Sequence, residues 1–210
     1  MLIWSSFLEL LRVSLFALAH VCGGSLGGGI LVLSLIIRVA LLPLTLRLAI
    51  RARELELARR RLQPKVDALR KRYASPVDQM IATRELYAAN GIDAAPKGTL
   101  LGTLLQLPVA TGVYQTIASV ATRVIRFLWV KDLSRPDALV ASVAAGLAGA
   151  AVMAGPTSPT SRTAAGLAAV VTFLFAWRVS AGVGLYWLAS NAVGVVQSLL
   201  VRRASSKQIA

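Results

Sequence analysis

Residues 26–48 read LGGGILVLSLIIRVALLPLTLRL, a stretch that is almost entirely apolar or small, with Arg38 near its middle. A helix of this length can cross about 30 Å of hydrocarbon. An arginine at the centre of such a helix costs about 2.5–3.5 kcal/mol to insert. Water or a partner must therefore reach the guanidinium, unless the side chain only snorkels or packs against backbone carbonyls in a structural role.

The composition of the whole chain indicates a multi-pass membrane protein. Of its 210 residues 56% are hydrophobic, the mean hydropathy is +0.68 and the formal net charge is +14. This is too apolar for an ordinary soluble domain and too basic for a passive anchor. We predict an all-α polytopic fold with five transmembrane helices, at residues 23–48, 99–122, 138–155, 163–179 and 183–201. The last two of these predicted spans are short, which indicates a tight helical hairpin and a locally thinned bilayer.

Residues 1–22 precede the first span and resemble a signal peptide only in length. They have no basic region before the apolar stretch and no small-residue cleavage site, so we expect the segment to be retained. Ser5, Glu9 and Arg12 share one helical face, which favours a helix lying in the outer interface of the membrane. A sixth span is the alternative.

Residues 49–98 form the one sizeable polar segment, predicted to be a cytoplasmic helical hairpin with Pro64 as a kink. Together with Arg47 it holds twelve of the 23 lysines and arginines. One explanation is that these charges fix the topology and attract anionic lipids. The alternative is that they contact ribosomal RNA or a nascent-chain carrier, although no RNA-reading motif is present. The residues expected to make such contacts are Arg59, Arg60, Arg61, Arg70, Lys71 and Arg72.

The distribution of basic residues also predicts the orientation. If residues 49–98 are cytoplasmic, the loop before the fourth span and the basic tail at 202–210 lie on the same side, giving sixteen basic residues inside against six outside. The positive-inside rule then places the N-terminus outside and the C-terminus in the cytoplasm. The outer loop at 123–137 runs against this rule, because it contains Arg123, Arg126, Lys131 and Arg135.

Polar residues recur at helical spacing in three of the predicted spans. Ser34, Arg38 and Thr45 share one face of the first span. Hydrogen bonding between helices explains any one such stripe, whereas three stripes beside a buried arginine favour a hydrated cavity. The other residues predicted to line that cavity are Thr103, Gln106 and Tyr114 in the second span and Trp187, Ser190, Asn191 and Gln197 in the fifth.

Several classes of chemistry are excluded by what the spans lack. None contains Asp or Glu, which removes a carboxylate acid–base pair and a carboxylate proton relay. Cys22 is the only cysteine, so an intramolecular disulfide is impossible and a thiolate metal cluster implausible. The glycine-rich run at 23–29 lacks the Gly-Lys-Ser/Thr ending of a phosphate loop. We therefore expect no enzymatic activity, no metal and no cofactor.

An ordered set of motifs gives the chain a specific resemblance. These motifs are Arg38 with Leu41-Leu42-Pro43-Leu44-Thr45, Leu62-Gln63-Pro64-Lys65, Leu86-Tyr87, Gly91, Leu104-Leu105-Gln106-Leu107-Pro108, Phe127-Leu128-Trp129, and Leu185-Tyr186-Trp187-Leu188-Ala189-Ser190-Asn191. With this set the chain resembles the YidC family of membrane protein insertases, with their Oxa- and Alb-type relatives, over about residues 20–203. The departures from the family pattern are Asp93-Ala94 in place of Asn-Pro, residues 98–102 in place of a Cys and a Pro, and Ser180 in place of a Pro.

The resemblance implies a five-helix bundle around a hydrophilic groove that is open to the cytoplasm and to lipid, with Arg38 at its centre. It further implies an insertase of the bacterial cytoplasmic membrane that works without nucleotide hydrolysis. Its expected partners are nascent membrane proteins and anionic lipids, with a ribosome and a Sec-type translocon as further candidates. A small anion channel or transporter, with Arg38 as its selectivity charge, is the first alternative. A folding chaperone that translocates nothing is the second.

Overall fold

The computed structural model describes residues 2–92, 97–120, 125–156 and 160–207, without the side chains of residues 2, 97–106 and 205–207. Within these ranges the chain is helical, with one isolated β-bridge between Phe127 and Val130 and no strand. The all-α fold class is thereby confirmed. The helices are α1 (Leu2–Val21), α2 (Leu26–Arg72), α3 (Pro76–Ala89), α4 (Lys97–Val120), α5 (Ala138–Ala154), α6 (Ser161–Ala176) and α7 (Ala181–Lys207).

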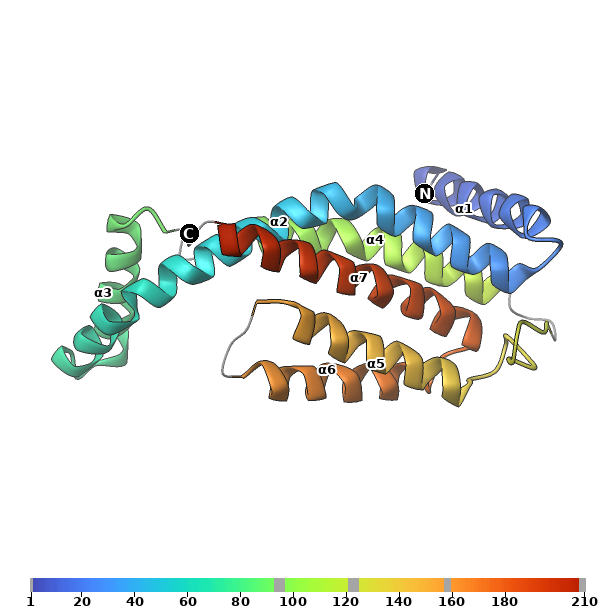
Figure 1. Cartoon of the computed structure of the whole chain (residues 1–210). Coiled ribbons are helices and arrows are strands. Elements are labelled where there is room, and N and C mark those ends of the chain that lie inside the picture. Colours follow the sequence, from blue (N-terminus) through green and yellow to red (C-terminus); the bar gives the residue numbers. More distant parts are fainter. Residues whose placement is uncertain (1, 93–96, 121–124, 157–159, 208–210) are drawn as a thin grey trace.

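Helix α2 is one continuous helix of 47 residues. Its start is capped by Ser25, whose hydroxyl oxygen accepts a hydrogen bond from the Gly28 amide at 3.2 Å. It passes through Pro43 and Pro64 without ending. The change from apolar to charged residues near residue 48 is therefore a change of side chains on an unbroken backbone, and the charged half of α2 extends beyond the bundle (Figure 1).

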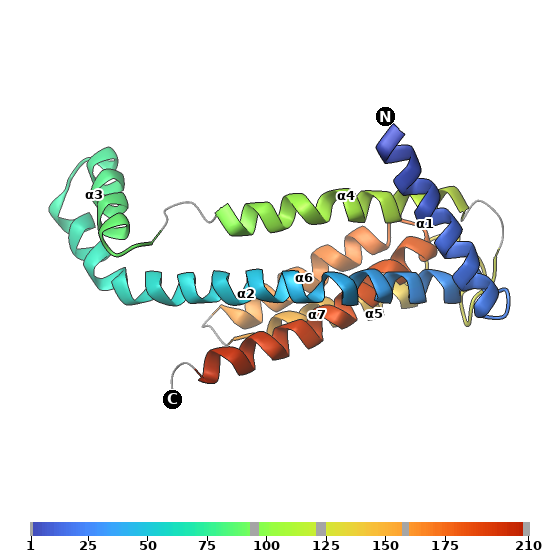
Figure 2. The same ribbon diagram turned by 90° about the horizontal axis from the view of Figure 1, so that it is seen from above.

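Helix α3 folds back on the charged end of α2, away from the other helices (Figures 1 and 2). The Gln79 side-chain amide fixes the turn by donating to the carbonyls of Arg70 at 3.2 Å and Tyr73 at 2.7 Å. Leu62 and Val66 of α2 are buried, whereas α3 has no buried residue. The contact between the two helices is thus narrow, which permits local opening.

The remaining helices form a bundle in which α7 is central. It contacts α2, α4, α5 and α6, with α2 and α4 on one side and the α5–α6 pair on the other (Figure 1). Helix α5 packs through small side chains, which lets helix backbones approach closely in a membrane. Its buried residues are Val140, Ala141, Ala144, Ala145 and Ala148.

The largest buried apolar cluster lies at the end of the bundle opposite α3. It joins Leu15 of α1, Ile30 of α2 and Ile117 of α4 to Leu133 of the loop before α5 and Leu185 of α7. Leu15, Ile30 and Leu133 are fully buried. Buried side chains therefore close this end, where α1, the starts of α2 and α7 and the loop before α5 meet (Figure 1).

Among the residues that the structure describes, three helices are long and apolar enough to cross a membrane, namely Ile3–Val21, Leu26–Arg72 and Ala181–Ala204. Helices α5 and α6 have 17 and 16 residues, or about 25 Å at 1.5 Å per residue, which is less than the usual hydrocarbon thickness. Length and composition thus permit α1 to span the bilayer. Its predicted place in the interface stays a prediction, as does the count of five spans.

Helices α1 and α2 approach closely at Gly29. A methyl group added there would lie 2.8 Å from the Ala19 amide nitrogen. Because this is a backbone atom, no side-chain rotation can relieve the contact. We expect Gly29→Ala to destabilise the protein by about 1–3 kcal/mol through overpacking. Gly146→Ala on α5, where no atom lies within 4 Å of the added carbon, should be neutral or stabilising by up to about 1 kcal/mol. The thermal midpoint of both variants in detergent checks this, and equal midpoints would contradict the close contact.

Candidate functional site

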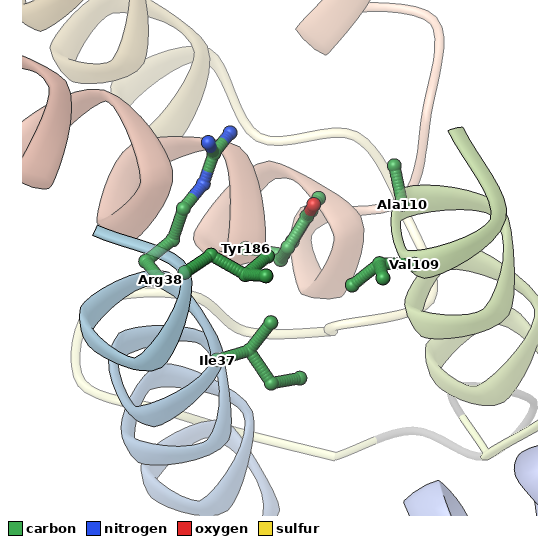
Figure 3. A pocket seen from close by; sticks show the side chains of 6 residues that line it. Ile37, Arg38, Val109, Ala110 and Tyr186 are labelled. Carbon is green, nitrogen blue, oxygen red and sulfur yellow. The ribbon is translucent and has the colours of Figure 1, made fainter. Parts of the chain in front are cut away.

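The candidate site is a pocket at the meeting point of three helices. Figure 3 shows Arg38 and Ile37 on α2, Tyr186 on α7, and Val109 and Ala110 on α4. Leu41 completes the lining, and the pocket holds about 30 Å³. That volume suffices for water but not for a helical segment of another protein.

Arg38 is half-buried at this pocket and carries a charge that the described residues do not neutralise. No hydrogen bond or ion pair joins its guanidinium to another residue in the part of the chain that the structure describes. The predicted spans contain no carboxylate that could serve as a counter-ion. The five N–H donors of the guanidinium are therefore available to water or to an incoming anionic group.

The position of Arg38 along α2 sets its depth in a membrane. It lies twelve residues after Leu26, where α2 begins, a rise of about 18 Å at 1.5 Å per residue. This is a little beyond half of a hydrocarbon layer of about 30 Å. A helix that enters the hydrocarbon at Leu26 would place this cation where the electrostatic cost of exposure to lipid is greatest, and the pocket leaves room for water beside it.

Three predicted groove residues, Ser34, Ser190 and Thr45, are buried. Ser34 is 1% exposed, and its hydroxyl donates to the Ile30 carbonyl of its own helix at 2.6 Å. Ser190 is 4% exposed, and its hydroxyl has no hydrogen-bond partner among the described atoms. In this structure neither serine hydroxyl contributes to the lining of the pocket around Arg38.

Three predicted residues hold helices together. The Thr45 hydroxyl on α2 lies 3.1 Å from Oε1 of Gln197 on α7, and Nε2 of Gln197 lies 3.4 Å from the Thr45 carbonyl. Asn191 of α7 donates to the Ala144 carbonyl of α5 at 3.0 Å. These contacts match the alternative interpretation of a polar stripe, in which it serves hydrogen bonding between helices.

The remaining predicted groove residues have varied surroundings. Tyr114 is 44% exposed on α4. Trp187 packs against Phe175 of α6, with ring centroids 4.7 Å apart, and against neighbouring Tyr186. The side chains of Thr103 and Gln106 lie outside those that the structure describes.

Tyr186 lines the pocket. We did not predict it as a groove residue, because the prediction used only the more polar residues of each span. A signal for it existed, because Tyr186 is four residues before Ser190 and shares the helical face of Ser190, Gly194 and Gln197. Its ring lies near Arg38 in Figure 3. Leu41, Val109 and Ile37 were also missed, since apolar residues in an apolar span give no sequence signal.

The basic residues of α2 beyond the bundle form a second group. Glu56 accepts from Arg53 at 2.8 Å and from Arg60 at 2.6 Å. Burial of Glu56 acts to raise its pKa, but the hydrogen bonds and charges of these two arginines outweigh it, so the pKa lies below 4.5. The Arg59 guanidinium lies 5.8 Å from the centre of the Tyr87 ring on α3. Arg61, Arg70, Lys71 and Arg72 are exposed.

Fold and pocket together define a helical protein with helices long and apolar enough to cross a membrane and a half-buried arginine between three of its helices. The profile of the family described as "60Kd inner membrane protein" matches residues 17–208. The membrane protein insertase YidC of Enterococcus faecalis is 31% identical over 85% of this chain and 67% of its own length. The YidC of Clostridium tetani is 27% identical over 89% of this chain and 86% of its own.

A solved structure agrees with these sequence relatives. The crystal structure of an active YidC insertase with its first transmembrane domain resolved superposes with a TM-score of 0.64 at 24% identity, over 91% of this chain and 45% of that one. The fold is therefore shared, although the chain spans less than half of the solved protein. The chain belongs to the YidC family, as its sequence motifs predicted.

The Thr45–Gln197 contact predicts a measurable coupling between α2 and α7. In a double-mutant cycle with Thr45→Val and Gln197→Leu, we expect an interaction energy of about 0.6 kcal/mol, the average for polar contacts between membrane helices. Unfolding in mixed micelles measures it. The matched control pairs Thr45→Val with Asn191→Leu, whose side chain bonds to α5 instead, and should be additive. Additivity in both cycles would show that the contact between Thr45 and Gln197 carries no energy.

Proposed function

We propose that this protein is a membrane protein insertase and chaperone. It moves hydrophobic segments of client proteins, with their short polar tails, from the cytoplasm into the bilayer through a hydrated groove centred on Arg38. The observation that carries this proposal is the uncompensated guanidinium in a pocket between α2, α4 and α7. Membership of the YidC family, whose relatives are membrane protein insertases, supports it.

The charge of Arg38 acts on the polar tail of the client. A carboxylate at about 4 Å is attracted by about 4 kcal/mol at an effective dielectric near 20, before desolvation is subtracted. This attraction lowers the barrier for a tail that carries Asp or Glu, because it offsets part of the cost of bringing that tail into the membrane. In this proposal Gln106, Tyr114, Trp187, Asn191 and Gln197 keep the groove polar along the path of the tail.

The free energy of insertion comes from the client itself. Burial of its apolar segment in lipid contributes about 25 cal/mol per Å², which for a whole span exceeds the attraction to Arg38. No nucleotide hydrolysis is then required. The groove has a kinetic role, since it gives the polar tail a route that avoids the bare hydrocarbon.

The charged part of α2 and helix α3 act as the cytoplasmic hairpin that receives clients. Their narrow contact and exposed basic residues suit a mobile element that meets nascent chains, anionic lipids and, in a cell, a ribosome or a Sec-type translocon. The protein resides in the bacterial cytoplasmic membrane, with five spans, α1 in the outer interface, the N-terminus outside and the C-terminus in the cytoplasm. The positive-inside distribution supports this orientation.

Replacement of Arg38 tests the electrostatic step. We expect Arg38→Glu to slow the insertion of a client with an acidic tail by about tenfold or more, even if desolvation removes two thirds of the attraction. Arg38→Lys should have a milder effect, since it keeps the charge. Protease protection of a purified client tail in proteoliposomes without nucleotide measures the rate.

Two controls separate the charge effect from loss of fold. The same client with a neutral tail should be much less affected by Arg38→Glu, and Arg162→Glu, at an exposed position on α6, should leave both clients unchanged. Equal insertion of acidic tails by wild type and Arg38→Glu would refute the proposed role of the charge. Anion conductance through the proteoliposomes without insertion would favour the channel alternative.

A further inference from the structure

The loop between α4 and α5 contains a tight turn with two exposed apolar side chains. Phe127 and Val130 exchange both backbone hydrogen bonds, at 2.9 and 2.8 Å, and so enclose a two-residue turn of Leu128 and Trp129. Leu128 is 73% exposed and Trp129 is 48% exposed. A large exposed apolar pair at the tip of a tight turn is not explained by packing within this chain.

The backbone at the tip is strained in a way that a small residue would avoid. Leu128 has a φ of +52°, the only positive φ at a non-glycine residue in the described part of the chain. This left-handed conformation is adopted readily by glycine and at a cost by leucine. An apolar side chain held in strained backbone, and exposed there, indicates a role outside the folded chain.

The base of the loop is fixed to the membrane-spanning part of the bundle. The Leu133 and Arg135 carbonyls accept from the amides of Gly182 and Ala181, the first residues of α7, at 3.0 and 2.8 Å. Val130 and Leu133 are buried in the core cluster. Because α7 is long and apolar enough to cross a membrane from Ala181 onward, the turn lies at the level where the bilayer begins.

Positive charge surrounds the tip. Arg126 and Lys131 flank the turn and are exposed, and no ion pair joins either of them to another described residue. Arg135 lies 3.4 Å from Asp132 but remains 83% exposed. Hydrogen bonds from Ser134 to Asp132, helped by Arg135, hold the Asp132 pKa below its usual value, so this carboxylate stays ionised and fixed in the loop.

We propose that this turn is a membrane anchor, in which Leu128 and Trp129 insert into the bilayer interface while Arg126 and Lys131 bind anionic lipid headgroups. Tryptophan favours the interface because its ring is apolar with one polar N–H group. Basic residues at that level are attracted by the surface potential of anionic lipids. The anchor accounts for basic residues that the positive-inside rule would place on the other side. It does not depend on insertase activity.

The test measures the depth of the tip in the intact protein. Leu128→Cys in a Cys22→Ala background carries an environment-sensitive fluorophore and is reconstituted into nanodiscs of phosphatidylcholine with or without phosphatidylglycerol. We expect blue-shifted emission that is quenched by lipid-attached spin labels and protected from iodide. The matched control is Val77→Cys on α3, which is 59% exposed and outside the bundle and should be quenched by iodide.

A second variant tests the charges. Arg126→Gln with Lys131→Gln should shift the Leu128 probe toward water in discs that contain phosphatidylglycerol and should change it little in phosphatidylcholine alone. Circular dichroism of each variant checks that the helices persist. A probe at position 128 that iodide quenches as strongly as at position 77, in both lipids, overturns the proposal. Protection from iodide that arises only on addition of another membrane protein would identify a protein partner and overturn it equally.

Discussion

The proposed function depends on one electrostatic constraint, a guanidinium at bilayer depth among predicted spans that contain no carboxylate. A buried counter-ion would neutralise Arg38 and remove its capacity to attract anything else. Full exposure to lipid would cost several kcal/mol. The intermediate solution is a pocket between α2, α4 and α7 that is large enough for water and is lined largely by apolar groups. In the proposed function this keeps the charge solvated close to a medium of low dielectric constant, where its field is strong.

Helix packing keeps this pocket in place. At one end of the bundle the helices and the loop before α5 share a buried apolar cluster that includes Ile30, Ile117 and Leu185. Further along, Thr45 and Gln197 link α2 to α7 beyond the pocket. Arg38 lies between these two fixed regions on the same helix. The apolar cluster closes one end, so access for a polar group is from the other, where α2 and α7 carry their charged residues.

Features that depend on residues close in the sequence, such as helix ends, could be predicted from the sequence. Features that depend on contacts with another helix could not. The bounds of α3 follow local signals, since Pro76 begins it and Gly91, with a φ of +69°, follows its end. Helical spacing placed Thr45 on the same face as Arg38. It could not show that the Thr45 hydroxyl would donate a hydrogen bond to Gln197 of α7. Nor could the spacing show that the Ser34 hydroxyl donates to the Ile30 carbonyl of its own helix.

Helix α2 also acts as a lever. Its 47 residues form one rod, and the distance from Arg38 to its end at Arg72 is about 50 Å at 1.5 Å per residue. A tilt of about 5° at the pocket displaces the distant tip by about 4 Å, and the reverse transmission holds as well. Pro43, five residues beyond Arg38, is where such a rod bends most easily. In the proposed function, a client bound at the charged tip would therefore change the direction of that tip relative to the part of α2 around Arg38.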